Sequence, residues 1–287
     1  MSKTKIIVYP YDDQFTPILR RRELLRNYEV VGLVSPRGWG LNGRDAGQAD
    51  NGSPLGLSIT SDFDGSLELC DAVLFSESRT QLEFEQAFKP KVMKAIETGK
   101  DILFIFPLKE EIRNEISKAC ATRGVNFKYY PEIRLAPQRI FGEDDLALEL
   151  DTPVIFVLGT GERTNKFEIQ LALRENMMKM GYKVSQVGTR GYCELLGFHS
   201  FPGFMFGNGI SEISKISSFN RFIKGLEGDE CPDVIIIGVP GGIMPFNNRL
   251  PNRYGILAYE VSQAVTPLIQ RYTAPIIQNT LPSISAK

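Results

Sequence analysis

The chain has 287 residues, of which 43% are hydrophobic and 23% are charged. This composition is typical of a globular protein, and the length suits two domains of roughly 100–150 residues each. The 33 Lys and Arg residues against 34 Asp and Glu residues give a formal charge of -1. Such a balance lacks the basic field that holds a nucleic-acid backbone, so nucleic acid is excluded as a partner.

Targeting signals and cysteine spacing predict the compartment. The first residues carry no signal-peptide pattern, and no apolar stretch reaches the ~18 residues of a membrane span. The cysteines are scattered without a CxxC pair, which is typical of reduced thiols. We therefore expect a cytoplasmic protein with no membrane partner, and homo-oligomerisation stays open. The four cysteines are Cys70, Cys120, Cys193 and Cys231.

Strand-like and helix-like runs alternate over the first half of the chain. The strands are expected at 5–9, 30–34, 72–75, 101–106 and 127–130. The helices are expected at 17–26, 84–96 and 110–123. This alternation predicts βαβ units and a mostly parallel, Rossmann-like sheet in a domain covering 1–134. The glycine-containing stretch 36–56 predicts a functional or mobile loop, because loops at the carboxyl ends of parallel strands line the ligand crevice.

A second α/β unit is predicted over 151–287, after a connector at 135–150 that carries Pro137, Gly142 and an acidic run. Its strands are expected at 154–158, 184–187 and 233–237, with one more near Ile276. Its helices are expected at 167–180 and 256–265. The fold class is therefore α/β, with two mostly parallel sheets in two domains.

The turn after the strand at 154–158 has the context of a phosphate-binding loop, which makes the second domain P-loop NTPase-like. Small residues in such a turn let backbone N–H groups converge on an anion. A lysine at the first turn of the next helix adds charge to its positive end. The same order of strand, glycine-rich turn and helix also occurs in α/β proteins without a phosphate ligand. On the motif alone, a phosphate-binding loop and an ordinary turn are therefore equally supported. The predicted phosphate-binding residues are Gly159, Thr160, Gly161, Thr164, Asn165 and Lys166.

Three residues depart from the standard motif. Asn165 stands where a glycine normally precedes the lysine, although Asn tolerates the left-handed conformation. Phe167 stands where a hydroxyl would hold Mg²⁺, and Gly238 stands where an acidic residue would order the metal. Gly241 and Gly242 then form either a close approach to a ligand or a simple tight turn.

A loop with its phosphate side partly kept and its metal side lost predicts weak nucleotide binding or poor hydrolysis. ATP or another nucleotide is the expected ligand, and a standard Mg²⁺ site is not expected. The candidates for a substitute metal ligand are Glu162, Glu168 and Asp233.

A second ligand site is predicted in the first domain. Asp12 follows the first strand, where a carboxylate binds ribose or metal, with helix capping as the alternative. The anion and stacking candidates of the glycine stretch are Arg37, Trp39 and Arg44. No G-x-G-x-x-G fingerprint follows the first strand, which argues against NAD binding in the usual way. Cys193 and His199 form a candidate thiol–imidazole pair, with a structural role favoured.

Three resemblances rest on these segments. The spacing from Gly159 to Lys166 and the turn 238–242 resemble the dethiobiotin-synthetase-like branch of P-loop proteins. The two-domain layout is similar to uncharacterised proteins with epimerase-like or N-acyltransferase-like descriptions. The segments 7–13, 35–40, 165–167 and 191–194 resemble the peptide maturation system protein family of bacterial natural-product cassettes. This last resemblance covers the chain up to about Pro267 and implies a C-terminus that is incomplete or altered.

These resemblances imply three functions, which we order by the evidence. The first is a nucleotide- or phosphate-binding accessory protein in peptide maturation. The second is a scaffold that binds a precursor peptide or a peptide-modifying enzyme. The third is an ATP-dependent ligase or N-acyltransferase, which Phe167 and Gly238 disfavour.

Overall fold

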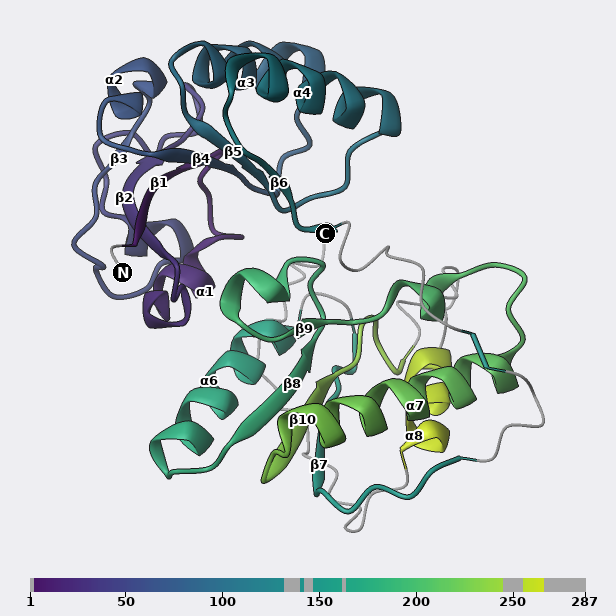
Figure 1. The fold of residues 1–287 in the computed structure, drawn as a ribbon. Helices are drawn as coiled ribbons and strands as arrows, with labels where there is room; N and C mark the ends of the chain where they lie inside the picture. The colour runs from purple at the N-terminus through teal and green to yellow at the C-terminus, as the bar shows by residue number, and fades with distance from the viewer. Residues whose placement is uncertain (1–2, 132–139, 142–146, 162–163, 245–254, 266–287) are drawn as a thin grey trace, which may run out of the picture. The chain divides into compact units, whose positions relative to one another are not determined.

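The computed structural model describes residues 3–131, 140–141, 147–161, 164–244 and 255–265. The chain divides into two compact units (Figure 1). The first unit is Met1–Gln138 together with Arg190–Gly203, and the second is Arg139–Thr189 together with Phe204–Lys287. The grouping of Arg190–Gly203 with the first unit has no counterpart in the domain ranges expected from the sequence. The predicted strand near Ile276 and most of the predicted connector lie outside the described residues.

Six parallel strands form the sheet of the first unit, in the order β3-β2-β1-β4-β5-β6. The order reverses direction between β1 and β4, which is the switch point where open α/β sheets place their ligand crevice. Every residue of β4 is buried, as expected for a central strand covered on both faces. The strands are β1 (Thr4–Tyr9), β2 (Tyr28–Val34), β3 (Ile59–Thr60), β4 (Ala72–Phe75), β5 (Asp101–Phe104) and β6 (Phe127–Tyr129).

Helices α3 (Lys89–Glu97) and α4 (Glu110–Arg123) lie on one face of this sheet (Figure 1). Helix α4 has Glu110 and Glu111 in its first turn and ends at Gly124, which has a φ of 69°. Acidic residues favour the start of a helix, and glycine takes the left-handed cap without strain. Both helix ends are therefore readable from the sequence, and α4 has the predicted bounds.

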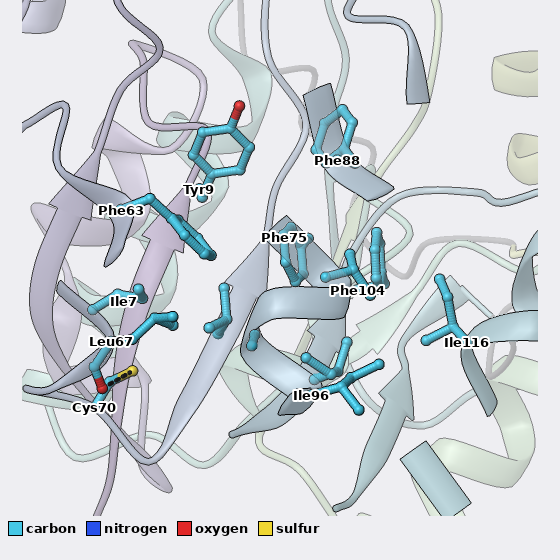
Figure 2. Close-up of a cluster of buried hydrophobic side chains, with 14 of the residues drawn as sticks. Ile7, Tyr9, Phe63, Leu67, Cys70, Phe75, Phe88, Ile96, Phe104 and Ile116 are labelled. Atoms are coloured by element: carbon cyan, nitrogen blue, oxygen red, sulfur yellow. Dashed lines mark hydrogen bonds between the residues drawn. The ribbon is translucent and has the colours of Figure 1, made fainter. Parts of the chain in front are cut away.

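The core of the first unit lies between this sheet and its helices (Figure 2). Phe75 and Phe104, on neighbouring strands, stack with ring centroids 4.8 Å apart. Tyr9 meets Phe63 and Phe88 edge-on. Aromatic pairs of these geometries add stability beyond the burial of their area.

The predicted helix at 17–26 is wrong in extent. Helix α1 (Thr16–Leu19) has four residues, and a separate 3₁₀ turn, η1 (Arg22–Leu24), follows. Arg21 between them has φ -132° and ψ 43°, which is not helical. The chain leaves the helix at Arg20, whose side chain binds Asp50 and Ser53 instead of following a solvated helix face.

The remaining short elements of the first unit are α2 (Phe63–Leu67), η2 (Ala46–Asp50), η4 (Cys193–Leu196) and β9 (His199–Ser200). A π-helical turn, η3 (Phe84–Phe88), precedes α3, so the helix expected at 84–96 is divided into two elements.

In the second unit, three parallel strands run in the order β7-β10-β8. These are β7 (Val154–Val157), β8 (Val184–Gly188) and β10 (Val234–Gly238), close to their predicted ranges. Helix α6 (Lys166–Lys179) packs on one face through Leu173 and Met177. The strands are flanked by α6 and α7 in Figure 1. Helix α7 (Glu212–Glu230) contacts α8 (Ile256–Ala264).

Candidate phosphate-binding loop

The lysine of the predicted loop is buried between two turns. Lys166 is the first residue of α6 and is 9% exposed. Its ammonium donates a hydrogen bond to the carbonyl of Gly241, in the turn after β10. Lys166 therefore does not point away into solvent, and its side chain links the turn after β7 to the turn after β10.

Two glycines make this crossing sterically feasible. A Cβ at Gly159 would lie 2.8 Å from Cδ of Lys166, so the lysine stem passes directly over this glycine. A Cβ at Gly242 would lie 2.7 Å from Cα of Gly161 and 3.0 Å from the carbonyl oxygen of Thr160. Gly242 is thus required for close packing of the two turns against each other, whereas the sequence suggested a close approach to a ligand or a simple tight turn.

Backbone hydrogen bonds join the same two turns. The N–H groups of Ile243 and Met244 donate to the carbonyls of Gly159 and Thr160, both at 3.0 Å. Gly241 adopts a φ of 80°, which favours glycine. The predicted residues Gly159, Thr160, Gly161, Lys166, Gly241 and Gly242 are therefore brought together.

Asn165 adopts φ 54° and ψ 22°, the left-handed conformation expected for an asparagine in place of the motif glycine. Its side chain makes no capping hydrogen bond to α6. Thr164 donates from its hydroxyl to the carbonyl of Gly161, at 3.3 Å. Among described residues, no hydrogen bond uses the backbone N–H of Thr160, Gly161 or Asn165. These amides are donors that a bound anion can accept from.

The position expected for a metal-binding carboxylate is taken by an amide. A Cβ at Gly238 would overlap the carboxamide of Gln170, which lies one helical turn after Lys166. Gln170 is fully buried, and neither its nitrogen nor its oxygen has a hydrogen-bond partner among the described residues. The spacing of four residues puts Gln170 on the same helix face as Lys166, which is the one signal for it in the sequence.

Of the suggested substitute metal ligands, Asp233 is wrong. It precedes β10 at the amino end of the sheet, where its carboxylate accepts from the N–H of Lys183 at 2.7 Å. Five strand residues then separate it from the loop, a distance of roughly 16 Å. Glu168 lies in the first turn of α6, and Glu162 lies outside the described residues. Phe167 is buried and offers no hydroxyl.

Asp12 of the predicted second site lies at the switch point of the first sheet. Its carboxylate accepts from the N–H groups of Gln14, at 2.9 Å, and Arg79, at 2.7 Å. Burial raises the pKa of the Asp12 carboxyl, although both amide hydrogen bonds act to lower it. Asp12 thus connects the turn after β1 with the turn after β4.

The glycine stretch 36–56 is held by its own side chains. Asp45 accepts from the N–H groups of Gly47, Leu55 and Gly56, each at 2.8 Å. Arg20 binds both carboxylate oxygens of Asp50 from outside the stretch, at 3.0 and 2.6 Å.

The other three residues of the predicted second site show no such role. Arg37 and Arg44 are exposed, and Trp39 is half-buried. Within the described ranges, no hydrogen bond or ion pair joins any two members of the set Asp12, Arg37, Trp39 and Arg44. The structure therefore does not assemble this set as one site.

The segment from Arg190 to Gly203 gives Cys193 a structural role. Its backbone N–H donates to Ser200 at 3.1 Å, and its thiol lies 3.2 Å from the carbonyl oxygen of Arg190. Burial raises the pKa of the Cys193 thiol far above its ordinary value, which suppresses the reactive thiolate. A thiol held in this state is not activated as a nucleophile.

None of the described helices has the length and apolar character needed to cross a membrane. Within the described residues, no group of three or more His, Cys, Asp or Glu side chains is arranged to hold a metal ion.

No family model matches this sequence, and no curated protein matches it. Among solved structures, the chain is similar to a DUF1611 family protein from Anabaena variabilis, with a TM-score of 0.63 and 9% identity. That alignment covers 92% of this chain and 72% of that protein. At this identity the similarity shows a shared fold and nothing about a ligand.

Two other solved structures align less well. An NAD-binding protein from Listeria innocua is 17% identical over 57% of this chain and 48% of that one, with a TM-score of 0.36. An amine dehydrogenase from Mycobacterium smegmatis is 16% identical over 64% of this chain and 63% of that one, with a TM-score of 0.35. At TM-scores this low, neither similarity supports a conclusion about this chain. The α/β fold with parallel sheets is confirmed, and the relationships to dethiobiotin synthetases and to peptide maturation proteins stay predictions.

Proposed function

We propose that this protein binds a phosphate-bearing anion, such as a nucleotide, over the loop amides of Thr160, Gly161 and Asn165, next to Lys166. The observation that carries the proposal is the burial of Lys166 at the N-terminus of α6. A helix N-terminus is already the positive end of the dipole, so a cation there is electrostatically unfavourable by itself. An anion between this ammonium and the loop amides would stabilise both.

The proposed role is binding, with little or no hydrolysis. Phosphoryl transfer needs a metal ion to neutralise developing charge. Phe167 and Gly238 supply neither of the two side chains that normally hold that metal. This chemistry supports a nucleotide-binding accessory protein over an ATP-dependent ligase or acyltransferase.

The cellular context in this proposal comes from the resemblance to peptide maturation proteins in segments such as 165–167. We propose an accessory role in maturing a ribosomally made peptide. Pull-down of a precursor peptide or its modifying enzyme tests this context. Capture that is independent of both nucleotide and Lys166 would favour the scaffold alternative.

Isothermal titration with ATP, ADP, GTP and inorganic phosphate, with and without Mg²⁺, tests the binding proposal. Lys166→Met keeps the length of the side chain and removes its charge, and we expect affinity to fall by at least about tenfold. Lys179→Met is the matched control, because Lys179 lies in the last turn of the same helix and is 68% exposed. If neither the wild type nor either variant gives a measurable heat of binding, the proposal is contradicted.

A further inference from the structure

We propose that Gln170 is a second recognition group of this loop, and that it binds an oxygen of the phosphate in the place of a metal-ordering carboxylate. This inference rests on the proposed function and names the anion chemistry that the site would take. It starts from the first turns of α6, where Lys166 and Gln170 are four residues apart and share one helix face.

The position of Gln170 is defined by Gly238. The carboxamide lies against the Cα of Gly238, the last residue of β10, where any larger side chain would collide with it. Gly241, which accepts from Lys166, is three residues further along the same turn. Gln170 and Lys166 thus approach the turn after β10 from the same helix.

A fully buried carboxamide with no partner is costly, because its desolvated donor and acceptor lose their hydrogen bonds to water. Both amide atoms of Gln170 are in this state among the described residues. Buried polar groups of native proteins are nearly always satisfied. Because Gln170 lies against Gly238, at the start of the turn that Lys166 contacts, an anion bound there would supply the partner that its carboxamide lacks.

The chemistry of a carboxamide defines the class of anion. Its NH₂ donates to a phosphate oxygen, and its carbonyl accepts from a protonated one. A hydrogen phosphate or phosphomonoester offers both kinds of group, whereas sulfate offers acceptors alone at neutral pH. Since the carboxamide carries no charge, it adds binding that does not depend on Mg²⁺. We therefore expect phosphate to bind more tightly than sulfate, and to bind equally well with or without Mg²⁺.

A second buried glutamine provides a matched control. Gln186 in β8 is also fully buried and without a partner for either amide atom in the described chain. It pairs with Ile236, two residues before Gly238, and therefore lies farther from the loop. Replacing an unsatisfied buried amide with an apolar group of similar shape is neutral or stabilising. Both Gln170→Met and Gln186→Met should then raise or preserve the thermal unfolding temperature.

Only Gln170→Met should change ligand binding. Titration of the full chain with inorganic phosphate, ATP and sulfate is expected to show at least about tenfold weaker phosphate or ATP binding for this variant. It should also show loss of the preference for phosphate over sulfate. Gln170→Glu keeps the size of the side chain and adds a negative charge, and we expect it to weaken Mg²⁺-free binding further than Gln170→Met does.

The outcomes separate this inference from the proposed function. Unchanged phosphate affinity in Gln170→Met, with binding lost in Lys166→Met, would overturn the role of Gln170 and leave the loop as a phosphate site. Equal weakening by Gln186→Met would also overturn it, because the effect would then be one of core packing. No binding of phosphate or ATP by wild type would overturn the proposed function itself.

Discussion

Two turns of this molecule, one in each unit, follow a parallel strand and precede a helix, and they carry side chains of opposite charge. In the turn after β1, the carboxylate of Asp12 accepts from the amides of Gln14 and Arg79. In the turn after β7, the ammonium of Lys166 donates to the carbonyl of Gly241. The first turn therefore contains its own anion, whereas the second contains its own cation.

The two turns therefore differ in whether their backbone N–H groups already have an acceptor within the protein. Backbone N–H groups that already bind an internal carboxylate have no capacity left for a phosphate. The glycine stretch of the first unit repeats the pattern, since Asp45 binds three amides there. In the loop of the second unit, the amides of Thr160 and Gly161 have no such acceptor in the described chain. The sign of the buried side chain thus predicts where a ligand anion can enter.

The largest effect is expected from Gly242→Ala. Its Cβ would press on the backbone of Gly161 and Thr160, which cannot rotate away. We expect a loss of about 1–3 kcal/mol in the free energy of unfolding, together with weaker phosphate binding. Urea denaturation and titration measure both. Gly225→Ala is the control, because a Cβ there meets open space in α7 and should stabilise by about 0.5–1 kcal/mol. Equal tolerance of both changes would show that the two turns are not packed as described.

Asp12→Asn tests the turn after β1, in which the carboxylate accepts two backbone hydrogen bonds. An amide can accept one of the two N–H groups but turns a donor toward the other, which should cost about 1–2 kcal/mol. Because the pKa of Asp12 is raised in the folded protein, protonation stabilises the wild type. That contribution is complete below the ordinary value of 3.8 and is lost as pH rises through the raised pKa.

The stability gap between wild type and Asp12→Asn should therefore narrow with increasing pH across that window. Urea denaturation of both proteins at a series of pH values measures the gap. A gap that stays constant, or widens as pH rises, would contradict the assigned environment of Asp12.

A smaller effect is expected from Arg20→Lys. The guanidinium binds both oxygens of Asp50 and the carbonyl of Ser53, and an ammonium cannot reproduce this fork. The pair is partly exposed, so we expect a loss of about 1 kcal/mol or less. Limited proteolysis within 46–53 should become faster. Arg22→Lys, at an exposed position of η1, serves as the reference and should change neither quantity.

The smallest effect is a pH dependence that comes from Asp45. Hydrogen bonds from Leu55, and then from Gly47 and Gly56, hold the pKa of this carboxyl below its ordinary value of 3.8. Its stabilisation of the loop is present above 3.8 and is lost as pH falls through the lowered pKa. Hydrogen exchange of the Gly47, Leu55 and Gly56 amides should then accelerate on acidification, relative to the pH trend in Asp45→Asn. Identical trends in the two proteins would argue against these hydrogen bonds.

Much of the fold could be predicted from the sequence because its signals are local. The bounds of β4 and α4 match those predicted, since one is a continuous apolar run and the other ends at a left-handed glycine. Helix α7 was missed, although it is the longest helix described. Several of its buried positions are polar, and their side chains bind backbone groups outside the helix. Asn220 accepts from Leu148, and Glu227 accepts from Asp151 and Thr152. Such residues hide the apolar period on which helix prediction depends.

The residues of the candidate site also fall into those that the sequence predicts and those that it does not. Gly159, Asn165 and Lys166 could be recognised because strand, turn and helix bring them together within a few residues. The spacing from Lys166 puts Gln170 on the same helix face but assigns it no role, because that role depends on Gly238, a residue 68 positions later in the sequence.

The sequence by itself determined the alternation of strands and helices, the left-handed turn at Asn165 and the position of a lysine at the start of α6. These features depend on backbone sterics and on contacts along a few consecutive residues. Only the tertiary structure decided that carboxylates of the first unit bind its own turn amides, and that the buried carboxamide of Gln170 lies beside Gly238. Those outcomes depend on which desolvated groups meet across the fold, and the cost of leaving such groups unpaired is a property of the packed chain.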